Sequence, residues 1–434
     1  MDMIEEHPHR YELVNELHAR PSSRMPVPGT TVHLAFKHPR DAANRDRAED
    51  ARHLEELCQR HAAPRPDISA GHYAARLGRY KLRWESHTEF VTYTASTPRL
   101  PERPFDPSAA EVFPAEWQRE SLGKRIVAVM VHVDYLPDDP QDIQPFLQDW
   151  FIPDSMAAVW VLEEVAIVAG DFRIDPAGWM RFAIFVKPGV PQDRVGRIVQ
   201  RLLELETYRA LSMLGMGRAR DLTAQLNVLD PRLNQIVQSM IRSDLPAELA
   251  LQELLAVSAQ LESAAAAHAF RFGATGAYEA IVLDRVRVLR ESRFAGRQML
   301  TEFMARRYAP AMRTVKSAEK RLEDMLRRTE RAGELLRTRV DVERSAQNQA
   351  IMQRMDRRAD LQLRLQHTVE GLSVVAISYY AVGLAGYATA PLAQRLGIDK
   401  TLLIAVLTPV VVGLVWLSIR RIRARLHADG DGGH

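Results

Sequence analysis

The stretch GLSVVAISYYAVGLAGYATAPLA, residues 371–393, decides the fold because it carries no charged side chain. A second uncharged stretch, TLLIAVLTPVVVGLVWLSI, occupies residues 401–419. About 20 residues of α-helix cross the hydrocarbon core of a bilayer, and both stretches meet this length. A buried hairpin of two core helices in a soluble domain is the alternative, but a soluble helix normally keeps a polar face. The sequence therefore predicts two C-terminal transmembrane helices joined by a short outer turn, residues 394–400.

Basic side chains flank the two stretches and orient them. Arginines precede the first stretch, and the lipid-facing basic flank that follows the second consists of Arg420, Arg421, Arg423 and Arg425. The outer turn holds only Arg395 and Lys400, with Asp399 opposing them. Basic flanks stay on the cytoplasmic side, and residues 1–30 lack the apolar run of a secretory signal peptide. We expect a multi-pass protein of the bacterial inner membrane, with the lipid bilayer as partner and both termini, including a basic tail at 420–434, in the cytoplasm.

Three hydroxyl side chains of the first stretch recur at intervals of seven residues. Ser373, Tyr380 and Tyr387 therefore lie near one face of the expected helix. Hydroxyl and small residues favour packing between helices in lipid, and the same face is suited to line a pore. Neither stretch contains Asp, Glu, Lys, Arg or His, which argues against a proton relay. We take these three residues as pore-lining candidates, with interhelical packing as the alternative.

The region before the first stretch is expected to be helical. Residues 311–370 contain no proline and a single glycine, which predicts a long charged stalk helix of roughly 90 Å. Its heptad spacing is interrupted at Thr329, Arg339 and Glu343, so a long coiled coil is not well supported, although we expect the stalk to self-associate. Residues 221–310 are expected to form a helical hairpin whose turn is Gly273-Ala274-Thr275-Gly276.

Residues 1–220 show the pattern of a cytoplasmic α+β or α/β domain. Runs rich in β-branched and aromatic residues predict strands at 31–36, 79–84, 89–94, 125–133, 158–169 (one strand or two) and 180–186. Helices are expected over 40–61 and 192–214, and the second should end at Gly215-Met216-Gly217.

Composition and motifs exclude several function classes. The chain has 434 residues with 58 basic and 55 acidic side chains, a balance that gives no reason to expect nucleic acid as a partner. A single cysteine, Cys58, excludes an internal disulfide and a zinc ribbon. The motifs HExxH, GxSxG and GxxxxGK[ST] do not occur, so we expect no enzyme, and no cofactor is identified.

One cluster of residue types suits a divalent cation. His87 lies between Glu85 and Glu89 in a strand-like run, and the two-residue period of a strand places all three side chains on one face. A solvated strand face is the alternative interpretation.

Several separated blocks carry a family resemblance. They are HPHRYELVNELHARP at 7–21, RWESHTEFVTYT at 83–94, LELETYRALSMLG at 203–215, RFGATGAYE at 271–279, FAGRQMLTEFMARRYAPAMRT at 294–314 and TVEGLSVVAISYYAVGLAGY at 368–387. In this order they resemble a bacterial family of uncharacterised membrane-anchored proteins that is defined only as a domain of unknown function. The resemblance spans nearly the whole chain and implies membrane anchoring, but it brings no activity, cofactor or catalytic residue.

The order of parts is also similar to that of CorA-like divalent-cation channels, which are homopentamers. That superfamily closes its first span with a Gly-Met-Asn motif, whereas this chain has Gly386-Tyr387-Ala388, and only Asp399 supplies an acid in the outer turn. The resemblance implies a homo-oligomer of about five chains and a divalent cation as cargo. Two functions follow as expectations: a CorA-like cation channel or transporter, or a membrane-anchored scaffold or regulatory protein without transport, whose protein partners the sequence does not identify.

Overall fold

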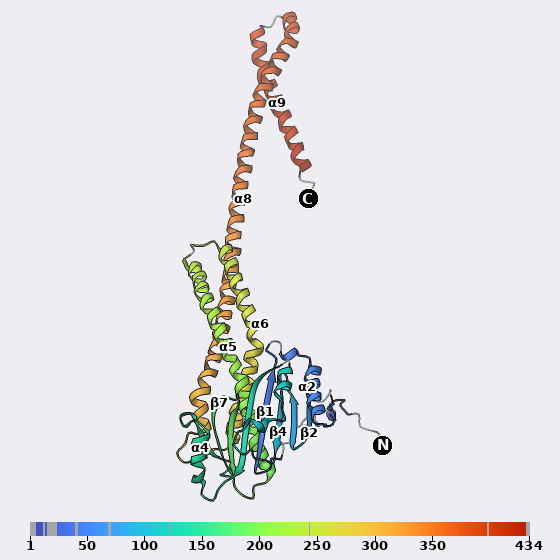
Figure 1. The fold of residues 1–434 in the computed structure, drawn as a ribbon. Helices are drawn as coiled ribbons and strands as arrows, with labels where there is room; N and C mark the ends of the chain where they lie inside the picture. Colours follow the sequence, from blue (N-terminus) through green and yellow to red (C-terminus); the bar gives the residue numbers. More distant parts are fainter. Residues whose placement is uncertain are drawn as a thin grey trace. The chain divides into compact units, whose positions relative to one another are not determined.

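The computed structural model describes residues 6–11, 14, 24–39, 42–67, 71–121, 123–242, 244–396 and 399–430. The contacts divide the chain into two compact units. The first unit contains Met1–Leu245 and Leu249–Gly333, and the second contains Pro246–Glu248 and Glu334–His434. The first unit thus extends across residues 220 and 310, the boundaries suggested by the sequence, and ends inside the expected stalk (Figure 1).

A nine-stranded mixed sheet forms the centre of the first unit. Its strands are β1 (Gly29–Lys37), β2 (His72–Leu77), β3 (Tyr80–Ser86), β4 (Phe90–Thr97), β5 (Lys124–Tyr135), β6 (Ala157–Val161), β7 (Ala166–Ile174), β8 (Met180–Val186) and β9 (Ser292–Arg293). They are ordered β2-β3-β4-β1-β5-β8-β7-β6-β9. Only β5 and β8 pair in parallel, so the sheet is mostly antiparallel, and short turns join β2 to β3, β3 to β4, β6 to β7 and β7 to β8.

Strand β1 is an interior strand next to the central β5, and all of its residues are buried because both faces are covered. Side chains alternate along a strand. Val32, Leu34 and Phe36 join a hydrophobic core with the helices α2 (Arg47–Arg60) and α3 (Ala115–Glu120). His33 belongs to the alternate set, and its ring contacts Thr207 of helix α5 (Gln192–Arg242). The sheet therefore has an apolar side under α2 and α3 and a more polar side under α5.

The remaining helices follow the chain order. They are η1 (Ala42–Asn44), η2 (Pro107–Ala110), η3 (Pro140–Ile143), α4 (Gln144–Trp150), η4 (Pro153–Ser155), α6 (Ala247–Val288), α7 (Leu300–Phe303), the π-helical η5 (Met304–Tyr308), α8 (Ala309–Leu396) and α9 (Lys400–Gly430). All predicted strands are confirmed, with 158–169 forming two, whereas β2 and β9 were missed. The helix expected over 40–61 begins only at Arg47, because the Asp46 side chain caps it by accepting a hydrogen bond from the Ala48 amide.

Two turn predictions at glycines were wrong. Helix α5 continues through Gly215-Met216-Gly217 to Arg242, and α6 continues through Gly273-Ala274-Thr275-Gly276 to Val288. A Cβ on Gly215 would lie 2.4 Å from the Oγ1 atom of Thr275, so this glycine permits the close approach of α5 and α6. The helical pair is therefore α5 with α6, and the change of direction falls between Arg242 and Ala247.

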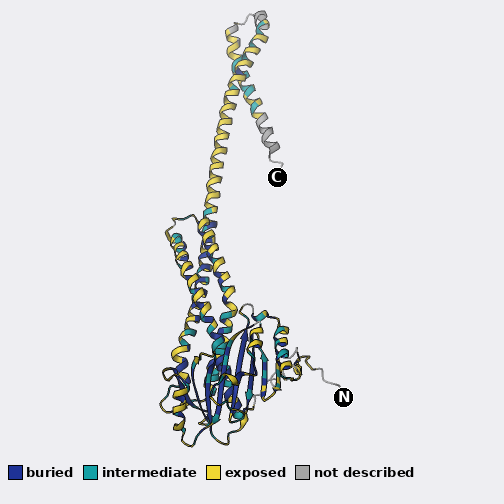
Figure 2. Ribbon diagram, viewed as in Figure 1, coloured by how far each residue is buried: buried dark blue, intermediate teal, exposed yellow. Residues whose placement is uncertain are grey.

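Helix α8 joins the expected stalk and the first apolar stretch in one helix of 88 residues. Its N-terminal part is packed within the first unit, where Arg321 and Arg328 pair with Asp230 of α5. Thr329 does not interrupt the heptad stripe, because it is buried and its hydroxyl donates to the Met325 carbonyl at 2.9 Å. From residue 344 to 369 every residue of α8 is exposed in the single chain (Figure 2).

The expected outer turn and tail are shorter than the sequence suggested. Helix α8 ends at Leu396 and α9 begins at Lys400, while residues 397 and 398 lie outside the described part of the chain. Helix α9 then continues to Gly430, through most of the expected basic tail. The long run of good helix formers after residue 419 explains this extension, because no proline or glycine interrupts it before Gly430.

Candidate functional site

The apolar parts of α8 and α9 expose many large hydrophobic side chains. Both helices are long and apolar enough to cross a membrane by length and composition. Only 6% of the apolar window of α8 is buried inside the chain, and 0% of that of α9. A hairpin in the core of a soluble domain would bury these side chains, so the soluble alternative has no support in the packing (Figure 2).

Two of the three pore-lining candidates lie along one crevice of the second unit. Tyr380 and Tyr387 line a space of about 750 Å³ between α8 and α9, together with Thr408 and Val412 of α9. Ser373 lies outside this crevice, and its hydroxyl donates to the Val369 carbonyl of its own helix at 2.8 Å. Ser378 was not among the pore-lining candidates, but it also lines the crevice, and its buried hydroxyl has no hydrogen-bond partner in the described part of the chain.

The basic flank begins where the apolar part of α9 ends. The guanidinium of Arg420 lies over the ring of Trp416, 5.2 Å from its centroid. Arg421 is exposed, whereas the side chains of Arg423 and Arg425 lie outside the described residues. An arginine stacked on a tryptophan is typical of the boundary between hydrocarbon and water.

The sequence predicted that the three metal-ligand candidates share one strand face, and this prediction was wrong. Strand β3 ends at Ser86 and β4 begins at Phe90, so His87 and Glu89 belong to the turn between them. The His87 amide donates to the Phe90 carbonyl at 2.9 Å and closes this turn. Within the ranges that the structure describes, no group of three or more His, Cys, Asp or Glu residues is arranged to hold a metal ion. Glu85 and His87 line one polar cavity, and Glu89 points elsewhere.

Glu89 is fully buried and its carboxylate is used by other side chains. Arg271 donates to both carboxylate oxygens, and the Tyr278 hydroxyl donates to Oε1 at 2.7 Å. The Lys37 ammonium lies 3.2 Å from Oε2. Burial acts to raise the pKa of Glu89, but the hydrogen bonds from Arg271 and Tyr278 outweigh it and lower the pKa to about 2. The carboxylate therefore fixes the β3–β4 turn to α6 and leaves little capacity for a cation.

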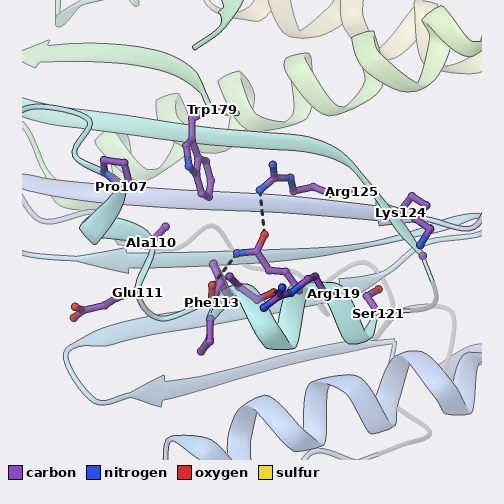
Figure 3. Close-up of a pocket in the computed structure, with 13 residues that line it drawn as sticks. Pro107, Ala110, Glu111, Phe113, Arg119, Ser121, Lys124, Arg125 and Trp179 are labelled. Atoms are coloured by element: carbon purple, nitrogen blue, oxygen red, sulfur yellow. Dashed lines mark hydrogen bonds between the residues drawn. The ribbon is translucent and has the colours of Figure 1, made fainter. Parts of the chain in front are cut away.

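A shallow basic cavity of about 700 Å³ lies beside α3 and the start of β5 (Figure 3). Among the described residues that line it, Arg119, Lys124 and Arg125 are exposed cations, and Glu111 is the single acid. Arg125 donates to the Gln118 side chain at 3.1 Å, and its guanidinium lies 5.7 Å from the Trp179 ring (Figure 3). This arrangement attracts anionic groups but offers no acid–base pair for catalysis.

The fold and these sites define a class of protein that combines a mixed α/β body with two helices of membrane-spanning length. A family model described as protein of unknown function (DUF3422) matches residues 5–426, so the chain belongs to this family. No curated protein and no solved structure matches it. The resemblance to a family defined only as a domain of unknown function is therefore confirmed over nearly the whole chain, whereas the description of the family assigns no activity and names neither membrane anchoring nor a CorA-like channel.

Proposed function

We propose that the chain is an integral protein of the bacterial inner membrane, anchored by the apolar parts of α8 and α9. The observation that carries this proposal is the exposure of their large side chains. Leu372 is 75% exposed, Leu384 71% and Leu402 64%. Removing one such side chain from water contributes about 1.5–3 kcal/mol, so lipid is a far better solvent than water for these helices. The arginines after residue 419 keep the C-terminal end, and with it the N-terminal body, on the cytoplasmic side.

We further propose that copies of the chain assemble through α8 into a CorA-like oligomeric cation channel. The exposed part of α8 between residues 344 and 369 is a single helix with apolar side chains and both signs of charge, the composition of a helix that packs on copies of itself. Tyr380 and Tyr387 differ by only about 20° around the helix, so a ring of chains would present both hydroxyls to one axis. Oxygen atoms without net charge replace part of the hydration shell of a cation.

The departure from the CorA pattern shapes this proposal. Gly386-Tyr387-Ala388 stands where the superfamily has Gly-Met-Asn, and Asp399 is the one acid of the outer turn. Cation selection would therefore depend on hydroxyl and backbone oxygens instead of an acidic ring, which predicts weak discrimination among divalent ions.

The test begins with the mass of the purified full-length protein in detergent. A closed assembly of about five chains is expected, and a monomer or dimer would remove the channel. Reconstitution in liposomes should then give divalent-cation flux that falls in Tyr380→Phe. Thr389→Val is the control, because Thr389 belongs to the same stretch but does not line the crevice and lies about 180° from Tyr380 around the helix.

The second candidate is a membrane-anchored scaffold or regulatory protein without transport. The basic cavity beside α3 favours it, since Arg119, Lys124 and Arg125 suit an acidic protein partner (Figure 3). Replacing residues 371–419 with an unrelated two-span anchor separates the two candidates. If the protein is a scaffold, the chimera restores the cellular function that is lost when the gene is deleted. If it is a channel, the chimera does not restore that function.

A further inference from the structure

A second polar cavity lies inside the first unit, between the sheet and the helices α5 and α6. Its volume is about 180 Å³, and it is more enclosed than the basic cavity beside α3. Charged and polar side chains dominate its lining, among them His33, Arg83, Glu85, Gln200, Glu204 and Arg285. One water occupies about 30 Å³ of liquid, so the cavity has room for a small molecule of four or five heavy atoms with some water.

Arg83 is a nearly buried cation of this cavity whose hydrogen-bond donors are not all used. Its side chain is only 15% exposed, and its ion pair with Glu85 is long, with 3.5 Å between Nη2 and Oε2. The Nε and Nη1 atoms of Arg83 are buried and have no hydrogen-bond partner among the residues that the structure describes. A guanidinium carries five N–H donors and is always charged, so unpaired donors in a buried position are costly.

The neighbouring charges are already paired. Glu204 accepts a hydrogen bond from Gln200 at 2.7 Å on one oxygen and from Arg285 on the other. Arg285 also donates to Asp284 at 2.8 Å. Neither group neutralises the unpaired side of Arg83.

His33 is satisfied by hydroxyl groups and holds no charge near neutral pH. Its two ring nitrogens lie 2.8 Å from the Thr94 hydroxyl and 3.0 Å from the Thr207 hydroxyl. Burial, with a contribution from the Arg83 charge, lowers the pKa of His33 to about 3. The imidazole therefore adds no cation, and Arg83 remains the group whose donors need an acceptor.

We propose that Arg83 binds a small oxyanion, a carboxylate or phosphate group, inside this cavity. A guanidinium presents two edges to a pair of oxygens, Nε with Nη2 and Nη1 with Nη2, and on each edge of Arg83 one donor is unpartnered. Glu85 lies beside the same guanidinium and competes with an anion for it. The bound anion lies between β3 and the pair α5–α6, so it ties the sheet to the helices. This inference goes beyond the proposed channel and does not depend on it.

Titration calorimetry of the full-length protein in detergent tests the site. Sodium phosphate and sodium acetate serve as separate probes at constant ionic strength, because surface charges respond to salt. One anion per chain is expected, and Arg83→Gln should weaken its affinity at least tenfold. Arg76→Gln on the neighbouring strand β2 is the matched control, since Arg76 is exposed and does not line the cavity.

A second variant gives a result that misfolding cannot imitate. Glu85→Gln removes the competing carboxylate and should tighten binding several-fold. A response to phosphate alone assigns a phosphoryl group, a response to acetate alone assigns a carboxylate, and a response to both assigns a general oxyanion site. The proposal is overturned when neither anion binds the wild-type protein, when Arg83→Gln binds as the wild type does, or when Glu85→Gln binds more weakly.

Discussion

Glu89 and Arg271 form a bidentate ion pair in the buried interior of the first unit, with 2.9 Å between Oε1 and Nη1. The two residues are 182 positions apart in the sequence. Glu89 lies in the turn between β3 and β4, and Arg271 lies on α6. Tyr278, two turns further along α6, donates to the same carboxylate. These contacts fix the direction of α6 relative to the sheet, because a charged pair out of water tolerates little displacement.

Glu89→Gln should therefore destabilise the protein strongly. Arg271 would keep its charge in a buried site without the carboxylate, and breaking such a pair costs about 3–5 kcal/mol. Chemical denaturation of the full-length protein in detergent, followed by tryptophan fluorescence, measures the change.

The control for this experiment is Glu111→Gln. Glu111 pairs with Arg79 at 2.8 Å, but the two side chains are 57% and 40% exposed. An exposed pair contributes at most about 1 kcal/mol. Equal losses in the two variants would show that the Glu89 pair has no special importance.

The buried His33 predicts a dependence of stability on pH. Burial lowers its pKa from 6.5 to about 3 in the folded state, so between these values the unfolded chain binds a proton that the folded chain does not. The neutral, buried His33 therefore does not reduce the free energy of unfolding above pH 6.5. As the pH falls from 6.5 towards 3, this residue lowers the free energy of unfolding by up to about 1.4 kcal/mol per pH unit. His33→Gln should reduce the slope of unfolding free energy between pH 6 and 4.

Other buried histidines also contribute to the decrease of the free energy of unfolding in acid. Burial also lowers the pKa of His53 and of His132, so acid destabilisation persists in the variant but involves about one proton fewer. Denaturation curves at several pH values report the proton count directly. A slope identical to that of the wild type would mean that His33 is protonated in the folded state.

The sequence predicted the local features well and the distant ones poorly. Strands β1, β5 and β8 follow from β-branched runs, and residues 311–370 of α8 follow from the absence of proline, which are local signals. Gly215 was taken for a helix end, because nothing in its neighbourhood reveals that Thr275 would approach it. Arg83 likewise gave no signal, since its unpaired donors exist only where β3 meets α5 and α6. A periodic sequence pattern identifies which face of a helix or strand is buried, but only the tertiary fold determines which element packs against that face.

The two glycines of α5 give a matched test of that point. Gly215→Ala places a Cβ against the short, stiff side chain of Thr275 and should cost about 1–3 kcal/mol by overpacking. Gly217→Ala meets no atom within 4 Å and should gain up to about 1 kcal/mol, because alanine is the better helix former. Thermal unfolding of both variants measures the difference. The same sign for both would contradict the close approach of α5 and α6.

The anchor is tested by one aspartate inside the proposed span and one outside it. Val411→Asp lies near the centre of the apolar part of α9, where a charged side chain costs about 2.5–3.5 kcal/mol on insertion scales. Ser345→Asp lies on the exposed part of α8 before the apolar stretch, where water solvates the new charge and the change should be nearly neutral. Fractionation of broken cells should therefore find less Val411→Asp protein in the membrane pellet, while Ser345→Asp behaves as the wild type does. Equal retention of the three proteins in the membrane pellet would contradict the proposal that the apolar part of α9 spans the bilayer.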